Sequence, residues 1–531
     1  MFSVIPRPQP RNECINYPRG GDPGLHRWER HVEGEPMSEQ PALIFGDRVL
    51  THAELSQRAA RCQAVIAAAG AGPGDRVAAM LPNGIEFFEF SLGAARAGCA
   101  VVPINWHLKS DEVSWLLRDS GARVLAVHRD FADTARQALG ADAPTVVLVV
   151  GGTGADSYEA AVAGASPVPE DGAPAWPEYV YYTSGTTGRP RGVERDRPPA
   201  DSALIHAGLA AMWGITGQDV WLACSPLYHA ANAYCFTTLA QGGTVVVQER
   251  WDAREWLALV ERHRVTACFM VPAHFIRLLE VPAAERDGHD LSSLRLVLHA
   301  AAPCPVPVKW QALDALPSAE VWEFYGATEG GATRISPDEW RQHPGSVGRP
   351  WPGVEIRILD DDGGPRPPGQ PGLIYVRPAG DSRFHYRNDA EKTGSAWRDG
   401  AFTVGDVGYL DADGYLYITD RASDMVIRGG VNVYPAEIEA ALHRHPLVVD
   451  CAVFGVPDER SGEELKALVE TREPVEVAVL AEFLRSQLAD YKVPRHVEIV
   501  ATLPRDPTGK VLKRRLRDAH WQDARNAVAA T

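Results

Sequence analysis

Residues 181–193 (YYTSGTTGRPRGV) concentrate groups that could bind phosphate. The stretch holds three glycines, four serine or threonine hydroxyls and two guanidinium groups. Glycines let backbone N–H groups turn toward an anion, and hydroxyls add donors. Arginine adds charge-assisted hydrogen bonds to phosphate oxygens. The spacing differs from that of the GxxxxGK[ST] P-loop. The pattern therefore predicts a strand followed by a phosphate-binding loop of another kind.

Other motifs follow one order along the chain, and with this loop they resemble a known family. They are 96–103 (RAGCAVVP), 226–229 (PLYH), 300–303 (AAAP), 325–329 (YGATE), 404–409 (VGDVGY), 420–424 (DRASD), 428–435 (RGGVNVYP) and 503–510 (LPRDPTGK). The ordered set resembles the AMP-forming adenylating superfamily: acyl-CoA synthetases, aryl-CoA ligases, luciferases and the adenylation domains of peptide synthetases. The resemblance spans roughly residues 35–520.

The resemblance implies a role for each residue of an ATP site. Tyr325 would stack on adenine, and Asp406 would accept hydrogen bonds from both ribose hydroxyls, with Arg421 near ribose and phosphate. Thr328 would donate to the α-phosphate. Glu329 would hold Mg²⁺ with phosphate oxygens and Thr183, since this hard cation prefers oxygen ligands. The resemblance also places Ala300, Ala301, Ala302 and Pro303 along the adenine, and Ser184, Gly185, Thr186, Thr187 and Arg191 at the phosphates.

Lys510 is the predicted catalytic lysine. The family lysine at this position bridges the substrate carboxylate and the ATP α-phosphate, where a fixed ammonium stabilises the transition state more than the ground state. Only seven of the 53 basic residues are lysines, so a lysine within a motif is informative. The resemblance further implies a small domain that rotates at the hinge residue Ser423 and brings the loop containing Gly430 to the site for the transfer step.

The chain departs from the family pattern at three places. Arg191 stands where the family usually has lysine, and its planar fork is expected to hold the β- and γ-phosphates differently. Ser423 stands where the family usually has aspartate or lysine at the hinge. No aspartate occurs between Tyr228 and Leu239, where members that activate amino acids bind the α-ammonium group. The last departure argues against an α-amino acid substrate.

The acid pocket is expected to combine aromatic, polar and small residues. This mixture suits an aryl or arylacrylic acid and would also tolerate a medium aliphatic chain. His229 matches the family's aromatic gate beside the acyl site, and the less favoured alternative is a structural histidine. The expected lining residues are Tyr228, His229, Asn232, Ala233, Phe269, His299, Gly326 and Gly331.

The motifs predict an acid–CoA ligase that uses ATP, Mg²⁺ and coenzyme A. The alternatives are a family member that passes the adenylate to a carrier-protein thiol or an amine, including activation of nitrous acid for diazotisation. A nucleotide-binding regulator without turnover is disfavoured by the presence of Lys510 and Glu329. The acid, the acceptor and the choice between monomer and homodimer stay open.

The strands and helices that must position these residues are expected to form an α/β fold. Strands at 76–81, 100–104 and 124–127 alternate with helices at 51–69, 86–97 and 110–120, which predicts βαβ units and a mainly parallel sheet. The α/β pattern continues with predicted strands at 221–224, 244–247, 267–271 and 295–299. Short strands between Asp/Gly turns then predict a β-rich part, and 151–177 is expected to be a surface connection.

The predicted fold class is therefore α/β: a large N-terminal domain of α/β sheet subdomains with a small β-rich subdomain, followed by a small mobile α+β C-terminal domain. The expected divisions are a flexible tail at 1–34, the large domain at 35–422 with its β-rich part at about 344–422, and the small domain at 423–531.

Composition narrows the class of protein. Hydrophobic residues make up 45% and charged residues 23%, which is ordinary globular usage. The net charge of −16 argues against non-specific nucleic-acid binding. No apolar run is long enough for a membrane span, and the N-terminus lacks an apolar signal core. A cytoplasmic enzyme with eight scattered cysteines as buried free thiols is expected, with neither CxxC nor HExxH metal motifs.

Overall fold

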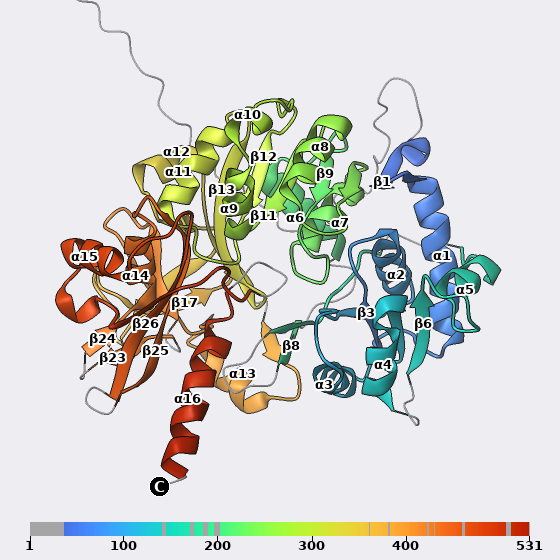
Figure 1. The fold of residues 1–531 in the computed structure, drawn as a ribbon. Coiled ribbons are helices and arrows are strands. Elements are labelled where there is room, and N and C mark those ends of the chain that lie inside the picture. The colour runs from blue at the N-terminus through green and yellow to red at the C-terminus, as the bar shows by residue number, and fades with distance from the viewer. Residues whose placement is uncertain are drawn as a thin grey trace, which may run out of the picture.

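The structure is a computed structural model with an N-terminal α/β unit, a central sheet that also takes in the first two strands of the chain, and a C-terminal unit. Figure 1 shows the N-terminal α/β unit (blue and teal) on one side of the central green and yellow unit, with the orange and red segments on the other. The residues described are 37–140, 145–169, 175–183, 190–195, 202–360, 362–380, 383–421, 424–428, 431–458, 462–505 and 511–529.

The first unit is a parallel sheet with helices on both faces, in the strand order β4-β3-β5-β6. Alternate side chains of β3 pack into two different hydrophobic cores, because Val77 belongs to one and Ala78 to the other. Helix α1 begins after Thr51, which forms a capping box with Glu54. The elements are α1 (His52–Ala68), β3 (Arg76–Met80), α2 (Ile85–Arg96), β4 (Ala100–Pro103), α3 (Ser110–Ser120), β5 (Val124–His128), α4 (Ala132–Leu139), β6 (Val146–Val150) and α5 (Tyr158–Gly164).

The central unit is a nine-stranded sheet in the order β15-β14-β13-β12-β11-β9-β10-β1-β2. The strands from β13 to β1 in this order are parallel, β2 and β14 are antiparallel to them, and β15 is antiparallel to β14. The strands are β1 (Pro41–Phe45), β2 (Arg48–Thr51), β9 (Val220–Ala223), β10 (Thr244–Val247), β11 (Ala267–Met270), β12 (Leu296–His299), β13 (Glu320–Ala327), β14 (Gly330–Ile335) and β15 (Arg349–Pro350).

Helices cover both faces of this sheet, and one face shares its core with the first unit. Phe236 of α7 packs against Phe88 of α2 with ring centroids 5.3 Å apart. The opposite face is covered by α8, α9 and α11. The helices are α6 (Ser202–Trp213), α7 (Asn232–Ala240), α8 (Ala253–His263), α9 (Pro272–Glu280), α10 (Ala283–Arg286), α11 (Val306–Ala315) and α12 (Pro337–Gln342).

Two antiparallel sheets complete the large part of the chain. One contains six strands, and the other joins β18 to the hairpin of β7 and β8. The elements are β7 (Tyr181–Thr183), β8 (Arg191–Arg195), β16 (Glu355–Leu359), β17 (Gly372–Arg377), β18 (Phe384–Tyr386), α13 (Ala390–Ala396), β19 (Trp397–Arg398), β20 (Ala401–Phe402), β21 (Asp406–Leu410) and β22 (Leu416–Arg421).

The C-terminal unit has its own sheet and its own core. Helices α14 and α15 pack on one face through Ile438, Leu480 and Leu484, and α16 packs against β25 on the other. The elements are β23 (Val426–Arg428), β24 (Val431–Val433), α14 (Pro435–Leu442), β25 (Val448–Asp458), β26 (Gly462–Thr471), α15 (Val477–Gln487), β27 (His496–Ile499) and α16 (Lys513–Ala529), with short 3₁₀ turns at Met37–Glu39, Arg129–Phe131 and Asp490–Lys492.

The predicted fold class is confirmed: a large N-terminal domain of several sheets precedes a small C-terminal domain. The expectation that 151–177 is only a connection is wrong, because Ser157 caps helix α5 within it. The seven cysteines in the described ranges are free, and six of them are buried; Cys14 lies outside those ranges. None of the helices in the described ranges has the length and apolar character that a membrane crossing requires.

Asp219 carries a testable part of the central sheet's stability. Its buried carboxylate accepts hydrogen bonds from Arg295 at 2.9 and 2.7 Å and from the Thr266 hydroxyl at 2.6 Å, so it ties together β9, β11 and β12. Burial alone would raise the pKa of Asp219, but these bonds outweigh it and lower the pKa. The stabilisation is therefore present above the pKa of an unfolded aspartate and is lost as the pH falls through the lower, folded value.

Asp219→Asn should lower the free energy of unfolding by about 2 kcal/mol at pH 7, because Arg295 loses its charged partner. The thermal midpoints of mutant and wild type should converge as the pH is lowered toward 3. Asp290→Asn, which breaks an ion pair whose side chains are half exposed, is the control and should change the midpoint little. A difference at pH 7 no larger than that of the control would contradict this role.

Candidate active site

The predicted phosphate loop joins β7 to β8 in the three-stranded sheet. Thr183 at the end of β7 pairs with Arg191 at the start of β8. A Cβ on Gly192 would come within 3.0 Å of the Tyr182 ring and 3.2 Å of the Val180 side chain, so a larger residue would require these side chains to shift. The predicted residues Ser184, Gly185, Thr186 and Thr187 lie outside the described residues.

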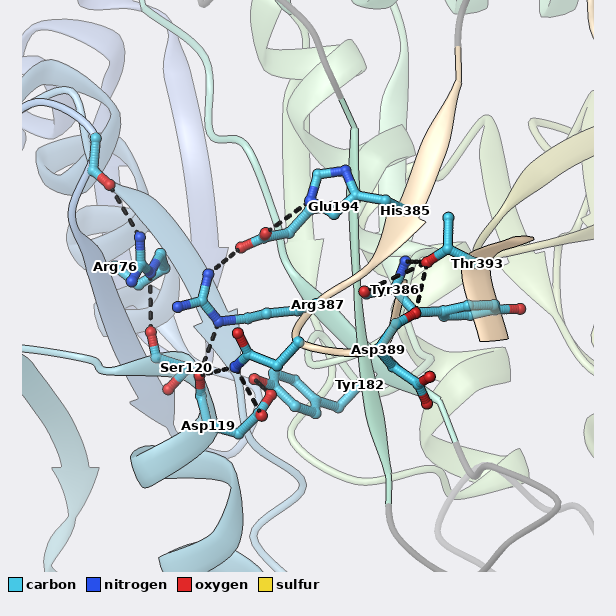
Figure 2. A network of polar contacts seen from close by, with 12 residues as sticks. Arg76, Asp119, Ser120, Tyr182, Glu194, His385, Tyr386, Arg387, Asp389 and Thr393 are labelled. Atoms are coloured by element: carbon cyan, nitrogen blue, oxygen red, sulfur yellow. Dashed lines mark hydrogen bonds and ion pairs between the residues drawn. The ribbon is translucent and has the colours of Figure 1, made fainter. Parts of the chain in front are cut away.

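Polar contacts fasten this hairpin to segments that are distant in sequence. The Tyr182 hydroxyl donates to Asp119 at 2.7 Å, and Arg387 donates to Glu194 at 2.9 Å and to the Asp119 carbonyl at 2.7 Å. Figure 2 shows these side chains converging between the end of α3, the hairpin and β18. The network holds the base of the loop against the first α/β unit.

Arg191, which stands in place of the family lysine, forms an ion pair inside the molecule. Its Nε lies 2.6 Å from Asp389 Oδ2, and both side chains are largely shielded from solvent. Asp389 also accepts from the backbone N–H of Lys392 and so caps α13. This helix therefore fixes the arginine that follows the loop.

The motif 325–329 spans the end of β13 and its turn into β14, and the structure brings it to the same hairpin. Arg195 of β8 donates to the Thr328 carbonyl at 2.5 Å. The buried Glu329 carboxylate accepts from the Tyr386 hydroxyl of β18 at 2.8 Å. Burial, reinforced by Glu329, raises the pKa of Tyr386, which keeps its hydroxyl a proton donor. Glu329 and Thr183 supply oxygen donors of the kind that Mg²⁺ prefers, so these residues fit the ion.

Tyr325 and Asp406 are joined directly. The Tyr325 hydroxyl donates to Asp406 Oδ2 at 2.7 Å, and Asp406 is buried at the start of β21. The backbone of Asp406 in turn pairs with that of Arg421 in β22. The two residues assigned to base and ribose thus share one hydrogen bond across the junction of the central and β-rich sheets.

Ala300, Ala301, Ala302 and Pro303 leave the end of β12, the strand next to β13. His299 and Glu323 are paired in this parallel register, so the stretch and Tyr325 emerge side by side at the carboxyl edge of the sheet. Ligands bind at this edge in open α/β sheets. Ala301 has φ of 77°, a left-handed backbone that alanine rarely adopts. The predicted Ser423, Gly430 and Lys510 lie outside the described residues.

Most of the expected acid-pocket residues gather on one face of the sheet. Asn232 is fully buried, donates to the Leu227 carbonyl and accepts from the Tyr181 hydroxyl, both at 2.8 Å. The rings of Tyr228 and His229 lie 4.6 Å apart in the preceding turn. Asn232 and Phe269 line a small hollow beside β9, and Ala233 follows on α7.

Gly326 and Gly331 face each other across the β13–β14 hairpin. A Cβ on Gly331 would meet the indole of Trp351 at 2.0 Å, so Trp351 covers this glycine pair. Trp351 was not predicted as a site residue, and neither were Asp389, Arg195 and Tyr386. Each of them reaches the site through a contact distant in sequence, which no local motif signals.

His299 does not join this group. Phe269 pairs with Leu298 in the register of β11 and β12, and Met270 pairs with His299. Because strand residues alternate between faces, His299 lies on the opposite face from Phe269. Its side chain is fully buried and contacts Lys309 and Glu323. The expectation that His299 lines the acid pocket is therefore not supported by its position.

Comparison with known proteins supplies the family. Models of the AMP-binding enzyme and of the AMP-binding enzyme C-terminal domain match residues 28–383 and 437–510. The chain is 34% identical to the fatty acid–[acyl-carrier-protein] ligase ScoC of Streptomyces coeruleorubidus, over 94% of this chain and 96% of that protein. It is 35% identical to a feruloyl-CoA synthase of an Amycolatopsis species, over 93% and 98%.

Among solved structures, the amide bond synthetase McbA of Marinactinospora thermotolerans superimposes with a TM-score of 0.80 at 30% identity, covering 91% of this chain and 97% of that one. The family model thus covers more than half of the chain, and relatives above 30% identity span nearly all of it. The chain therefore belongs to the AMP-binding enzyme family, the adenylate-forming acid ligases.

Proposed function

We propose that this ligase activates an aryl, arylacrylic or medium-chain carboxylic acid with ATP and transfers the acyl group to the thiol of coenzyme A. The observation that carries the proposal is the meeting of Tyr325, Asp406 and Glu329 with the Arg191–Arg195 strand at the carboxyl edge of the sheet. The base, the ribose and the phosphates of one nucleotide would each meet a suitable group there.

The reaction has two balanced steps. A carboxylate oxygen attacks the α-phosphorus, an oxygen–phosphorus bond forms, and the bond to pyrophosphate breaks. The thiolate of coenzyme A then attacks the acyl carbon, a carbon–sulfur bond forms, and AMP leaves. In the first step Lys510 would bridge the two anions as they approach. Mg²⁺, when bound by Glu329 and Thr183, supplies charge that neutralises the phosphates.

The residues around the acid position support a short, flat substrate. Tyr234 lies behind Phe269, with the rings stacked at 6.0 Å, and stacks on Trp221 at 5.5 Å. Phe324 closes the same side, 6.0 Å from Phe269. These packed rings fill the space between the sheet and α6 and α7, where a long alkyl chain would otherwise extend.

An acid panel scored by pyrophosphate release tests the activity and the substrate class together. Cinnamic, benzoic, hydroxyaryl and aminoaryl acids, C4–C12 fatty acids and nitrite should be compared, with coenzyme A, an amine and a carrier protein as acceptors. We expect the aryl and arylacrylic acids to exceed the C12 acid in kcat/KM and coenzyme A to be acylated. Product formed only with an amine or carrier would overturn the acceptor, and pyrophosphate release with none of the aryl, arylacrylic or C4–C12 acids would overturn the acid class.

A second candidate acceptor rests on the relatives. The names of ScoC and McbA assign them transfer to a carrier protein and amide bond formation, respectively. Both reactions share the adenylation step with coenzyme A ligation. Comparing coenzyme A, an amine and a carrier protein as acceptors in the panel distinguishes these three reactions.

Asp406→Ala should raise the KM for ATP strongly, because a buried acceptor for the ribose hydroxyls is lost. Tyr325→Phe should raise it by a smaller factor, because Asp406 loses the hydrogen bond that orients it. Steady-state kinetics at varied ATP, with thermal melting to confirm folding, measure both effects. Asp413→Ala, in the exposed turn after β21, is the control and should leave the KM unchanged. A folded Asp406→Ala with wild-type ATP KM would remove Asp406 from the site.

Lys510→Ala should slow adenylation by about 10²–10³-fold or more, mainly through kcat, because the charge acts on the transition state. Transfer from chemically prepared acyl-AMP to coenzyme A should be spared, because the lysine is expected to have rotated away by then. Both half-reactions are measured separately. Lys492→Ala, which breaks an exposed pair with Glu437 in the same unit, should leave both unchanged. Equal loss in both halves would instead indicate damage to the small domain.

A further inference from the structure

Three ionisable side chains, Lys309, Glu323 and His299, form a buried cluster that the proposed reaction does not use. Lys309 and His299 have no exposed surface, and Glu323 is 5% exposed. Lys309 Nζ lies 3.3 Å from Glu323 Oε2 and also donates to His299 Nε2. His299 Nε2 lies 3.5 Å from the same Glu323 oxygen. Removing three such groups from water is costly, so their retention calls for a physical reason.

The cluster is enclosed on all sides by packed side chains. The Phe275 ring meets the imidazole edge-on at 5.2 Å, and the Trp340 ring lies 5.5 Å from the Lys309 ammonium. Burial lowers the pKa of His299, and the neighbouring Lys309 lowers it further, so the imidazole is a neutral acceptor. The ammonium is therefore held by one carboxylate and one imidazole from two adjacent strands.

The position of the cluster in the fold suggests what it does. His299 ends β12 and immediately precedes Ala300, Ala301, Ala302 and Pro303. Lys309 belongs to α11, which begins where this loop ends, so the bond between Lys309 and His299 closes the loop at its base. The loop contains the left-handed Ala301, a conformation that persists only where the surroundings impose it.

Glu323 extends the same connection to the neighbouring strand. It pairs with His299 in the register of β12 and β13 and lies two residues before Tyr325. One buried ammonium thus links both segments that are expected to flank adenine. We infer that Lys309, through His299 and Glu323, is a positioning residue that fixes the spacing between the 300–303 loop and Tyr325 and thereby sets affinity for the nucleotide base. This inference rests on the proposed function.

Nucleotide binding tests the inference without knowledge of the acid. Affinity of the full chain for AMP and ATP is measured by titration calorimetry, with a thermal midpoint for each variant. Lys309→Met should weaken AMP binding about tenfold, because small displacements of binding groups have large effects. Where the acid is known, the KM for ATP should rise while kcat changes little. A residue that contributed only to folding would not raise the KM for ATP while leaving kcat almost unchanged.

A second variant separates an effect on AMP affinity from an effect on stability. Lys309→Met alone leaves Glu323 as an unpaired buried charge, so Lys309→Met/Glu323→Gln removes both charges and should recover stability but not AMP affinity. The matched control is Glu89→Gln. It breaks the buried contacts of Glu89 with Arg58 and Tyr158 in the first unit, and should lower the midpoint without weakening AMP binding.

The outcomes separate the two ideas. Variants that bind AMP within twofold of wild type, while wild type itself binds and releases pyrophosphate, would overturn the positioning role alone. Wild type that binds AMP but releases no pyrophosphate with any acid would overturn the proposed function, and weakened variants would still support the positioning role. Wild type that binds neither AMP nor ATP would overturn both.

Discussion

The short sheet of β7, β8 and β18 is the constraint on which the arrangement of the site depends. It contains only short strands, yet Arg191 and Asp389, which it brings together, are 198 residues apart in the chain. One side of the sheet bonds to the end of α3, and the other reaches Thr328 and Glu329 through Arg195 and Tyr386. A shift of this sheet would therefore displace the base of the predicted phosphate loop and disturb its contacts with Thr328 and Glu329.

Much of the fold follows from local pattern, because parallel strands covered on both faces must be apolar throughout. The predicted strand at 244–247 coincides with Thr244–Val247, and the helix predicted at 51–69 matches α1, which spans His52–Ala68. The pattern fails where a partner decides the structure. Strand β26 (Gly462–Thr471) contains the buried Glu464 and resembles no strand by composition, but ten of its residues pair with β25 and Arg428 neutralises Glu464.

The candidate site likewise has some features that local sequence predicts and others that depend on distant partners. The motifs name residues that the structure brings together, such as Tyr325 with Asp406, because each motif is local and the resemblance supplies their order. Two kinds of information are absent from a motif. One is the identity of partners such as Tyr386 and Asp389, which pair with Glu329 and Arg191 across 57 and 198 residues, respectively. The other is the face of the strand on which a residue lies, because His299 lies on the face opposite Phe269 and contacts Lys309 instead of lining the expected pocket.

Buried charged side chains lie at both edges of the central sheet, where strands begin and where they end. Asp219 ties strand beginnings with Arg295 and Thr266, whereas Lys309 ties strand ends with His299 and Glu323. Apolar packing would hold these strands together equally well, but it is non-directional and tolerates sliding. A hydrogen-bonded charge resists sliding because any displacement leaves it unpaired in a medium of low polarity. The cluster at the carboxyl edge is therefore placed where a precise strand end matters most, beside the loop and the tyrosine that would hold the base.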